Sequence, residues 1–470
     1  MKSCLAATVV LTIAGFAAAG GGEMPTVAKY SIDLAYRAED PGIEALADVT
    51  FVEGSAVPSE LVFYLHGELS IDEVTVDGES IDVEQDLVWY PSDYAGVARR
   101  SRIDMAGRKM PRRLSIRYSG KLNPSVARAP SNYMRVDPDG IFLRSYGYSL
   151  WFPTFLEADR DTYAVEAEIT VRTPASLMAV VTGERLEDTV EGNLRVSRWR
   201  AADDIFNIQL TARPFRLIQE GGFHLYSLRD AESVATAAEI LSFTSKLQEF
   251  FRENYSDGGG GGQLHVVQMP RFGDISSGNM VGISDRIWRG FDPASYSGRT
   301  LAHELVHPFV HLHLPRRSEF YAFVIEGFPS YFHLPAMASI LGGDFYRDSI
   351  VRIQGAYLER RETGLDRRGN PLPEERPLLE LTAADIPNFK DRFVLADRGL
   401  LFFNWLRERI GTDDFAAFTK ELFALETLDF ENFAALIQSH LPGSKDDVDL
   451  WLRTTEFPAR FRLEAQNPRG

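Results

Sequence analysis

Cysteine is nearly absent from this chain of 470 residues, in which Cys4 is the single example. Cys4 lies in an N-terminal segment that we expect to be removed, so the mature chain would contain no thiol. This excludes thiol catalysis, cysteine metal sites and disulfide bonds. The fold must therefore be stabilised by burial of apolar side chains, for which a hydrophobic content of 44% is ordinary.

Long hydrophobic runs are also scarce, and the prominent one extends from Leu5 to Ala19. It is shorter than the roughly 20 residues that span a bilayer. Lys2 precedes the run, and the small side chains of Ala17 and Ala19 suit signal peptidase. We therefore predict a cleaved signal peptide at residues 1–19 and an exported protein, periplasmic or extracellular, without a stable membrane span. An uncleaved N-terminal anchor is the alternative.

Basic residues are outnumbered, since 50 Lys and Arg stand against 67 Asp and Glu. The formal net charge is −17, and it would be −18 after removal of Lys2, with 49 basic residues against 67 acidic ones. Such a balance argues against nucleic acid or an anionic lipid surface as a partner. The length favours two or three domains.

The first part of the chain, residues 24–218, has the alternation of β-strands. Apolar residues recur at every second position in four segments, namely Tyr30–Tyr36, Leu61–Leu65, Leu114–Tyr118 and Tyr163–Val171. Asp77-Gly78 follows Val74 and Val76 and indicates a hairpin turn. No long helix-period segment occurs here, so we predict an antiparallel β-sandwich domain.

From about residue 219 the pattern changes to mixed α and β. A short strand at Phe223–Ser227 precedes an amphipathic helix from about Ala231, and Leu264–Gln268 reads as a buried strand. Five glycines, Gly258–Gly262, predict a flexible loop and not a phosphate-binding loop, because no Lys-Ser/Thr follows. Helical spacing dominates after Glu326. The chain is thus predicted to be a multidomain α+β protein.

A metal-binding motif opens at His303, where the sequence reads His-Glu-x-x-His. On a helix, His303 and His307 lie on one face, so both imidazoles can converge on one cation. Glu304 is then placed to take a proton from a water molecule beside the metal. Glu326 follows His307 after 18 intervening residues and is the candidate third ligand. This combination predicts a zinc hydrolase.

His311 and His313 are rival third ligands. His311 lies about 12 Å beyond His303 along a straight helix, which is too far for a shared zinc. His313 occupies the third histidine position of the metzincin pattern, but that pattern needs a glycine where Val310 stands. A metzincin-type endopeptidase using His313 stays a lesser alternative. Pro308 is expected to kink or tighten the helix after His307.

The segment from Ile325 to Tyr331, IEGFPSY, resembles the N-E-G-F-A-x-Y of the gluzincin aminopeptidases, whose members include alanyl aminopeptidase and leukotriene A4 hydrolase. The resemblance covers most of the mature chain. It implies a saddle-like β domain followed by a thermolysin-like zinc catalytic domain at residues 219–462, in a short form without a C-terminal helical domain. It also implies one Zn²⁺ per chain, bound by His303, His307 and Glu326, with Glu304 as general base.

The sequence departs from this family at the position that holds the substrate's free amine. The family's G-A-M-E-N corresponds to Gly278-Asn279-Met280-Val281-Gly282, where Val281 replaces the glutamate. Valine offers an ammonium group neither a charge nor a hydrogen-bond acceptor. Gly278, Asn279 and Met280 remain candidate substrate-binding residues. Asn279, Asp274 or Asp285 could substitute for the glutamate.

A second departure concerns the family's transition-state tyrosine in Y-x-K-G. The matching segment keeps a basic residue, Arg398, and Gly399, but has Ala396 at the tyrosine position. Loss of an oxyanion donor typically lowers the rate by about 10²–10³. Arg398, Arg392 or a tyrosine from elsewhere could compensate. Alternatively, Arg398 is a solvated residue at a helix start.

The leading hypothesis is an exported zinc metallopeptidase acting on peptides or proteins, similar to an aminopeptidase but with altered recognition of the N-terminal amine. The alternative is a weakly active or inactive zinc-bearing peptide-binding protein, which the changes at Val281 and Ala396 favour. Retention of Glu304 argues against it, because a purely structural zinc site needs no general base. The sequence leaves the oligomeric state open.

Overall fold

The structure is a computed structural model. It describes residues 26–55, 57–89, 97–122, 134–144, 149–155, 164–204, 208–220, 222–255, 263–269, 275–310, 314, 318–366, 368–382, 385–386, 394–425 and 428–462. The expected signal peptide and the five-glycine loop lie outside these ranges. Among the helices within them, none is both long and apolar enough to cross a membrane.

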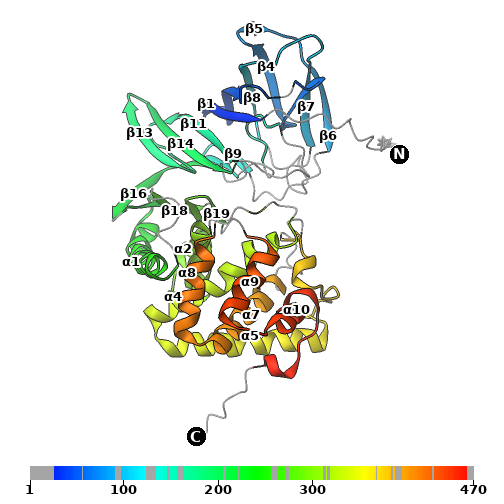
Figure 1. The fold of residues 1–470 in the computed structure, drawn as a ribbon. Coiled ribbons are helices and arrows are strands. Elements are labelled where there is room, and N and C mark those ends of the chain that lie inside the picture. The colour runs from blue at the N-terminus through cyan, green and yellow to red at the C-terminus, as the bar shows by residue number, and fades with distance from the viewer. Residues whose placement is uncertain are drawn as a thin grey trace, which may run out of the picture.

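The first part of the chain consists of β-sheets (Figure 1). The largest sheet has the strand order β13-β14-β11-β1-β2-β8-β4-β5. Its strands are β1 (Val27–Arg37), β2 (Gly42–Phe51), β4 (Leu69–Val76), β5 (Glu79–Ser80), β8 (Arg113–Gly120), β11 (Ala164–Pro174), β13 (Glu184–Glu191) and β14 (Leu194–Asp204). A three-stranded sheet contains β3 (Glu60–His66), β7 (Val97–Asp104) and β6 (Glu84–Trp89). A four-stranded sheet contains β12 (Met178–Val181), β15 (Leu210–Arg213), β10 (Gly140–Leu143) and β9 (Met134–Asp137).

The strand predictions for this half are confirmed where the structure describes them. In β1, Tyr30, Ile32, Leu34 and Tyr36 are all buried, because alternate side chains of a strand point to one face. Asp77 and Gly78 have φ angles of 49° and 92° and connect β4 to β5, as expected of a two-residue hairpin turn.

One pairing differs from the predicted antiparallel arrangement, because β1 and β11 run parallel, with Tyr30 opposite Ala167. A two-residue turn imposes antiparallel pairing on neighbouring strands, whereas a long intervening segment allows either direction. The described residues between β1 and β11 form nine other strands, so the pairing of β1 with β11 is set by packing and not by a local turn. Local sequence patterns carry no information on this direction.

The second half is built on a five-stranded sheet with the order β16-β17-β18-β20-β19. Its strands are β16 (Phe215–Glu220), β17 (Phe223–Leu228), β18 (Leu264–Met269), β19 (Ile275–Ser277) and β20 (Met280–Ser284). The domain boundary expected between residues 218 and 219 falls within β16. Helices follow from α1 onward and form the lower body of the molecule (Figure 1).

The helices of this half carry most of its apolar core. They are α1 (Ala231–Asn254), α2 (Asp285–Arg289), α3 (Tyr296–Val306), α4 (Phe328–Leu341), α5 (Gly343–Thr363), α7 (Gly399–Ile410), α8 (Thr412–Phe423), α9 (Phe430–His440) and α10 (Lys445–Arg453). Shorter helical turns are η2 (His307–Phe309), η3 (Phe323–Gly327), η4 (Leu378–Glu380), η5 (Val394–Arg398) and η6 (Ala459–Phe461). The helix predicted from about Ala231 is confirmed, with Ile240 and Phe251 on its buried face.

The five-stranded sheet packs on both faces. Val266 and Val281 belong to the core shared with the helices. Val267 and Met280, one position along each strand, belong instead to the core of the first half. This alternation explains why β18 and β20 are buried throughout, since both faces of the sheet are covered.

Polar contacts fix the joint between the two halves at Gly183. Asn279 Nδ2 donates to the Gly183 carbonyl at 2.9 Å, and the Gly183 N–H donates to Asn279 Oδ1 at 2.7 Å. His265 Nε2 also donates to the Gly183 carbonyl, at 2.8 Å. Because that bond uses the Nε2 proton, the neutral ring accepts from the Tyr226 hydroxyl at Nδ1, 3.4 Å away.

Burial of His265 predicts a loss of stability in acid. Burial lowers its pKa from the ordinary value of 6.5 to about 3. The unfolded chain therefore takes up a proton below pH 6.5 that the folded chain refuses, so this contribution is complete above pH 6.5 and is lost progressively towards pH 3. In urea unfolding across this range, we expect His265→Asn to reduce the pH slope by up to about 1.4 kcal/mol per pH unit. Equal slopes in both proteins would contradict this assignment.

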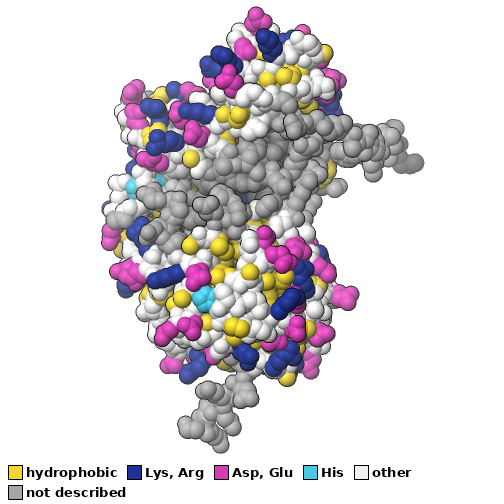
Figure 2. Space-filling view, viewed as in Figure 1, with side chains coloured by type: hydrophobic (Ala, Val, Ile, Leu, Met, Phe, Trp, Pro, Cys, Tyr) yellow, Lys and Arg dark blue, Asp and Glu magenta, His cyan; other side chains and the backbone are white. Residues whose placement is uncertain are grey.

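Charged side chains of both signs are interspersed over the surface shown in Figure 2. In the large sheet, for example, Arg200 lies 2.5 Å from Glu184, and Lys29 lies 2.6 Å from Glu168. Among the coloured atoms of Figure 2, acidic and basic side chains alternate and form no continuous acidic patch.

Candidate metal centre

Helix α3 carries the metal motif. It begins after Ser295, whose side chain accepts a hydrogen bond from the Ser297 N–H, and it ends at Val306. The next residues, His307–Phe309, form a 3₁₀ turn that includes Pro308. The expected tightening after His307 is confirmed. His303 and His307 remain on one face, with ring centroids 5.1 Å apart.

Glu326 is brought to this face by η3, a π-helical turn that leads directly into α4. Its neighbour Gly327 lies against Gly399, the first residue of α7, directly after the second π turn, η5: a Cβ on Gly399 would be 3.0 Å from the Gly327 Cα. The two segments can approach this closely because both residues lack a side chain. π turns within α-helices are frequent at functional sites, since they change the direction of a side chain.

His303 lies close enough to Glu326, and also to Glu304 and His307, to share one ion with them. His303 Nε2 lies 3.6 Å from Glu326 Oε2, near the separation of about 3.4 Å for two ligands of a tetrahedral zinc. Ligand atoms of His303, Glu304 and His307 all lie within 4.8 Å of one another. His303 Nε2 is buried and has no hydrogen-bond partner. Two imidazole nitrogens and a carboxylate oxygen are the kinds of donor that fit zinc.

Glu304 lies beside this ligand group and is itself buried, with 4% of its surface exposed. Its Oε2 is 3.9 Å from His307 Nε2. Both carboxylates thus lie near His303, Glu326 at 3.6 Å and Glu304 within 4.8 Å, so the geometry is compatible with Glu326 as the third ligand and Glu304 beside it. The arrangement therefore holds a carboxylate where it can exchange a proton with a group bound at the centre.

His333 is a residue of this site that the sequence analysis missed. Its ring lies 6.0 Å from the ring of His303, and its Nδ1 donates to the Pro329 carbonyl at 2.8 Å. Burial, with a contribution from His303, lowers the pKa of His333 to about 3, so the ring is neutral. The signal was its spacing, seven residues or two helical turns after Glu326, which places both on one face of the helix.

The rival ligands His311 and His313 lie outside the described residues. Val310, which stands where the metzincin pattern needs glycine, has a φ of −89°. This is an ordinary conformation for a β-branched residue and not the left-handed one that a glycine permits.

This chain is similar to known proteins in its structure. No family model matches the sequence, and no curated protein matches it. Native yeast LTA4 hydrolase has a TM-score of 0.68 at 17% identity, over 92% of this chain and 68% of that one. The chain has the fold of the M1 zinc metallopeptidases.

Two further solved structures match over nearly their full length. A mutant M1 zinc metallopeptidase from Deinococcus radiodurans, bound to the substrate Tyr-Ser-Ala, has a TM-score of 0.64 at 15% identity, over 93% of this chain and 96% of that one. A two-domain M1 zinc metallopeptidase mutant bound to L-tryptophan has a TM-score of 0.67 at 14% identity, over 94% and 98%. The expected α+β architecture, with a β domain before a zinc-peptidase-like domain, is confirmed as a fold.

Within this M1 fold, the predicted substrate-binding segment lies on β20 and the turn before it. Gly278 has a φ of 54° in this turn, and Met280 and Val281 are fully buried. The side chain of Asn279 is occupied by the joint with Gly183 and by a further bond to the Gln263 carbonyl. The Asn279 side chain thus joins the two halves, and Met280 packs in the core of the first half.

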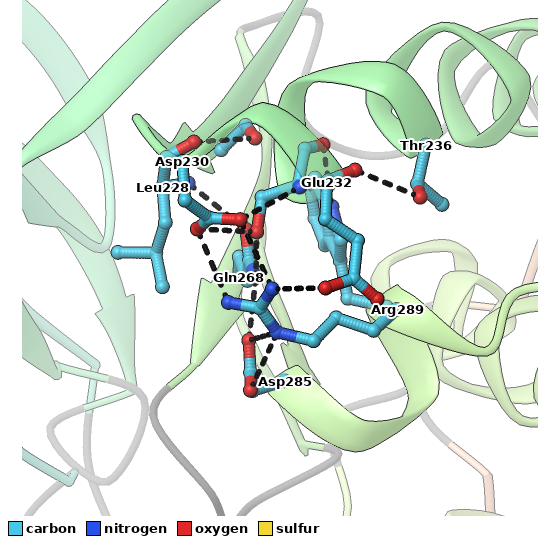
Figure 3. A network of polar contacts seen from close by, with 10 residues as sticks. Leu228, Asp230, Glu232, Thr236, Gln268, Asp285 and Arg289 are labelled. Carbon is cyan, nitrogen blue, oxygen red and sulfur yellow. Dashed lines mark hydrogen bonds and ion pairs between the residues drawn. The ribbon is translucent and has the colours of Figure 1, made fainter.

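Asp285 was a second candidate to replace the missing glutamate. Figure 3 shows it in a polar network around Arg289. Both Asp285 carboxylate oxygens accept from Arg289 Nε, at 2.9 and 3.0 Å, and Oδ1 also accepts from Gln268. Arg289 in turn binds Asp230 and Glu232 at the start of α1. This network connects α1, α2 and β18, so Asp285 has a structural position. Asp274 lies outside the described residues.

The structure contradicts both expectations for Arg398, which is neither a substrate contact nor a solvated residue at a helix start. Its side chain is fully buried and lies 2.7 Å from Glu375 Oε1. The remaining donors bind four backbone carbonyls near the end of the described chain, those of Leu450, Trp451, Thr454 and Glu456. Arg398 thus holds the segment from Leu450 to Glu456 against the rest of the second half. Arg392 lies outside the described residues.

The close contact between Gly327 and Gly399 predicts an effect of Gly399→Ala on metal binding. The added Cβ would lie 3.0 Å from the Gly327 Cα and 3.3 Å from Phe323 Cε2, so η3 must shift and displace Glu326. We expect zinc affinity to fall about 10- to 100-fold, as for loss of other supports of a metal ligand. Competition with a chromophoric chelator measures it.

Gly355→Ala is the matched control, because a Cβ at this position in α5 meets nothing within 4 Å. Its zinc affinity should equal that of the wild type. Unchanged affinity in Gly399→Ala would show that the glycine contact does not position Glu326.

Proposed function

We propose that this protein is a zinc-dependent peptidase of the M1 type, exported from the cell, which hydrolyses peptide bonds. The observation that carries this proposal is the cluster of ligand atoms from His303, Glu304 and His307, with the Glu326 carboxylate 3.6 Å from His303 Nε2. The M1 fold supports it, since one matched protein is described with a bound peptide substrate. One Zn²⁺ per chain is the expected cofactor.

The chemistry assigned to the chain's own residues is acid–base catalysis. Zinc, when bound by His303, His307 and Glu326, supplies a Lewis acid that polarises a carbonyl and favours deprotonation of water. Glu304 accepts the proton of the attacking water and returns it to the leaving amine, so its carboxylate is restored after each cycle. His333 supports the ring of His303 through its packing.

Recognition of the substrate's N-terminus is proposed to differ from that of an ordinary aminopeptidase. Val281 is fully buried and offers no charge, while Asn279 and Asp285 are occupied elsewhere. A free ammonium group therefore finds no carboxylate among these residues. We propose that a blocked N-terminus is accepted about as well as a free one.

Hydrolysis of paired peptides tests this function. The panel contains aminoacyl anilides, free peptides and their N-acetylated forms, each assayed before chelation, after chelation and after return of zinc. We expect cleavage that chelation abolishes and zinc restores, with free and acetylated peptides within about tenfold of each other. Chelator-resistant cleavage would overturn the metal mechanism, and strict dependence on a free amine would overturn the proposed recognition.

The second candidate function is a zinc-bearing peptide-binding protein with little or no turnover. The specific observation in its favour is Ala396, which leaves η5 without the hydroxyl that the resemblance places there. Among the tyrosines described, those at 255 and 357 use their hydroxyls on Phe332 O and Glu375. Stoichiometric zinc and peptide binding without any turnover would establish this alternative.

A further inference from the structure

We propose that the hydroxyl of Ser276 binds the substrate peptide beside the metal centre, as a neutral hydrogen-bonding subsite for its N-terminal side. The inference rests on the proposed peptidase function and adds the group that recognises substrate. Ser276 lies on β19, the edge strand of the five-stranded sheet. The M1-type zinc motif itself does not include it.

The direction of the Ser276 side chain follows from strand register. Ser276 pairs directly with Val281 on β20, and Ser277 pairs with Met280. Directly opposed residues of an antiparallel pair project to the same face. Val281 belongs to the core on the helical side, whereas Met280 belongs to the core of the first half. Ser276 therefore points to the side of the sheet that carries the metal helix.

β19 also lies next to the metal motif in space. It packs against η2, the turn that begins with His307, and against α3. The Ser276 side chain thus projects from the sheet next to the turn that holds one of the proposed zinc ligands. A peptide reaching the centre from this edge would pass the hydroxyl.

The hydroxyl is unsatisfied in the structure. Ser276 Oγ is buried and has no hydrogen-bond partner, the same condition as His303 Nε2 in the proposed zinc site. A buried hydroxyl without a partner is unfavourable, and a ligand that supplies the bond relieves this. Asn279, in the turn of this hairpin, is already used, because its side chain binds Gly183 and Gln263.

The chemistry of a hydroxyl defines what the subsite accepts. It can donate to a carbonyl of an acyl group or peptide bond, and it can accept from an amide or amine N–H. It carries no charge, so it does not select an ammonium group as a carboxylate would. The subsite thus suits peptides with either a free or a blocked N-terminus, in agreement with Val281 opposite it.

Peptide binding by three variants tests the proposal. Ser276→Ala is compared with Ser277→Ala, whose side chain lies on the opposite face of the same strand. Titration calorimetry of a tripeptide and its N-acetyl form in the zinc-loaded Glu304→Gln background gives Kd without turnover, and KM and kcat follow in the active protein. We expect Ser276→Ala to raise Kd and KM about three- to tenfold for both peptides, the effect of one lost hydrogen bond, with kcat changed less. Ser277→Ala should match its parent.

A structural hydroxyl would behave differently, because its removal would lower the Tm. We expect the Tm of Ser276→Ala to be equal to or above that of the parent. In addition, Ser276→Asp should shift preference towards the free-amine peptide by about tenfold, since a carboxylate then faces the amine. Unchanged Kd in Ser276→Ala would overturn the proposed subsite while leaving the peptidase function standing. Absence of peptide binding in every variant would overturn both.

Discussion

Replacement of Glu304 by glutamine is expected to lower kcat/KM for peptides by about 10²–10⁴-fold, the usual contribution of a general acid–base residue. The amide keeps the size of the buried side chain but cannot take a proton from water. Because His303, His307 and Glu326 remain, the variant should still bind one zinc ion. Steady-state kinetics together with the metal content of the purified variant measures both effects.

Glu319→Gln is a suitable control for removal of a carboxylate. Glu319 is 51% exposed and forms a surface contact 3.4 Å from Arg453. Its substitution should leave kcat/KM within about twofold, since surface ion pairs contribute about 0–1 kcal/mol. An unimpaired Glu304→Gln enzyme would refute the role of Glu304, whereas loss of zinc from that variant would show that Glu304 is itself a ligand.

Arg398→Met is expected to destabilise the protein by about 3–5 kcal/mol. Methionine has a similar length but removes the guanidinium, which leaves the Glu375 carboxylate and four backbone carbonyls without their buried donor. Arg361 also binds Glu375, at 2.8 Å, and would compensate in part for the charge but not for the carbonyls. Urea unfolding followed by circular dichroism measures the change.

Arg347→Met provides the matched comparison at an exposed ion pair. Arg347 is 65% exposed and lies 3.0 Å from Asp344, which is 87% exposed. Its loss should change the free energy of unfolding by less than about 1 kcal/mol. If Arg398→Met were as mild, then Arg398 would not hold the C-terminal segment in the way that its hydrogen bonds indicate.

The features that the sequence predicted correctly depend on local spacing. The strand positions follow from alternation of apolar residues, and the metal helix follows from two histidines four residues apart. The turn after His307 follows from Pro308, which has no N–H to continue a helix. Each of these patterns is contained within a few neighbouring residues, so the fold class could be predicted without knowledge of tertiary contacts.

The features that were missed depend on contacts between distant segments. Arg398 meets carbonyls more than 50 positions later in the chain, and Asn279 meets Gly183 in the other half. The sequence around Arg398 or Asn279 gives no indication of these distant partners. Ser276 is similar, because its importance depends on its register with Val281 and on the proximity of β19 to η2.

The chain combines the M1 fold and a compact metal-binding group with substitutions at positions where the family resemblance places substrate contacts. Val281 and Ala396 remove a carboxylate and a hydroxyl that the family resemblance implies, while Glu304 and its neighbours are kept. The basic residue of that motif, Arg398, contributes to stability, because it binds Glu375 and carbonyls near the C-terminal end of the described chain. These observations together favour hydrolysis with relaxed selection of the N-terminus over loss of function.

Zinc titration of the metal-free protein tests the central claim most directly. Peptide hydrolysis is measured as zinc is added to chelator-treated wild type and to His307→Ala. We predict activity that rises linearly to one equivalent of zinc and then stays constant, with no activity before addition and none in His307→Ala at one equivalent. Full hydrolysis by the metal-free protein, or an unaltered titration in His307→Ala, would contradict a zinc peptidase centred on His303, His307 and Glu326.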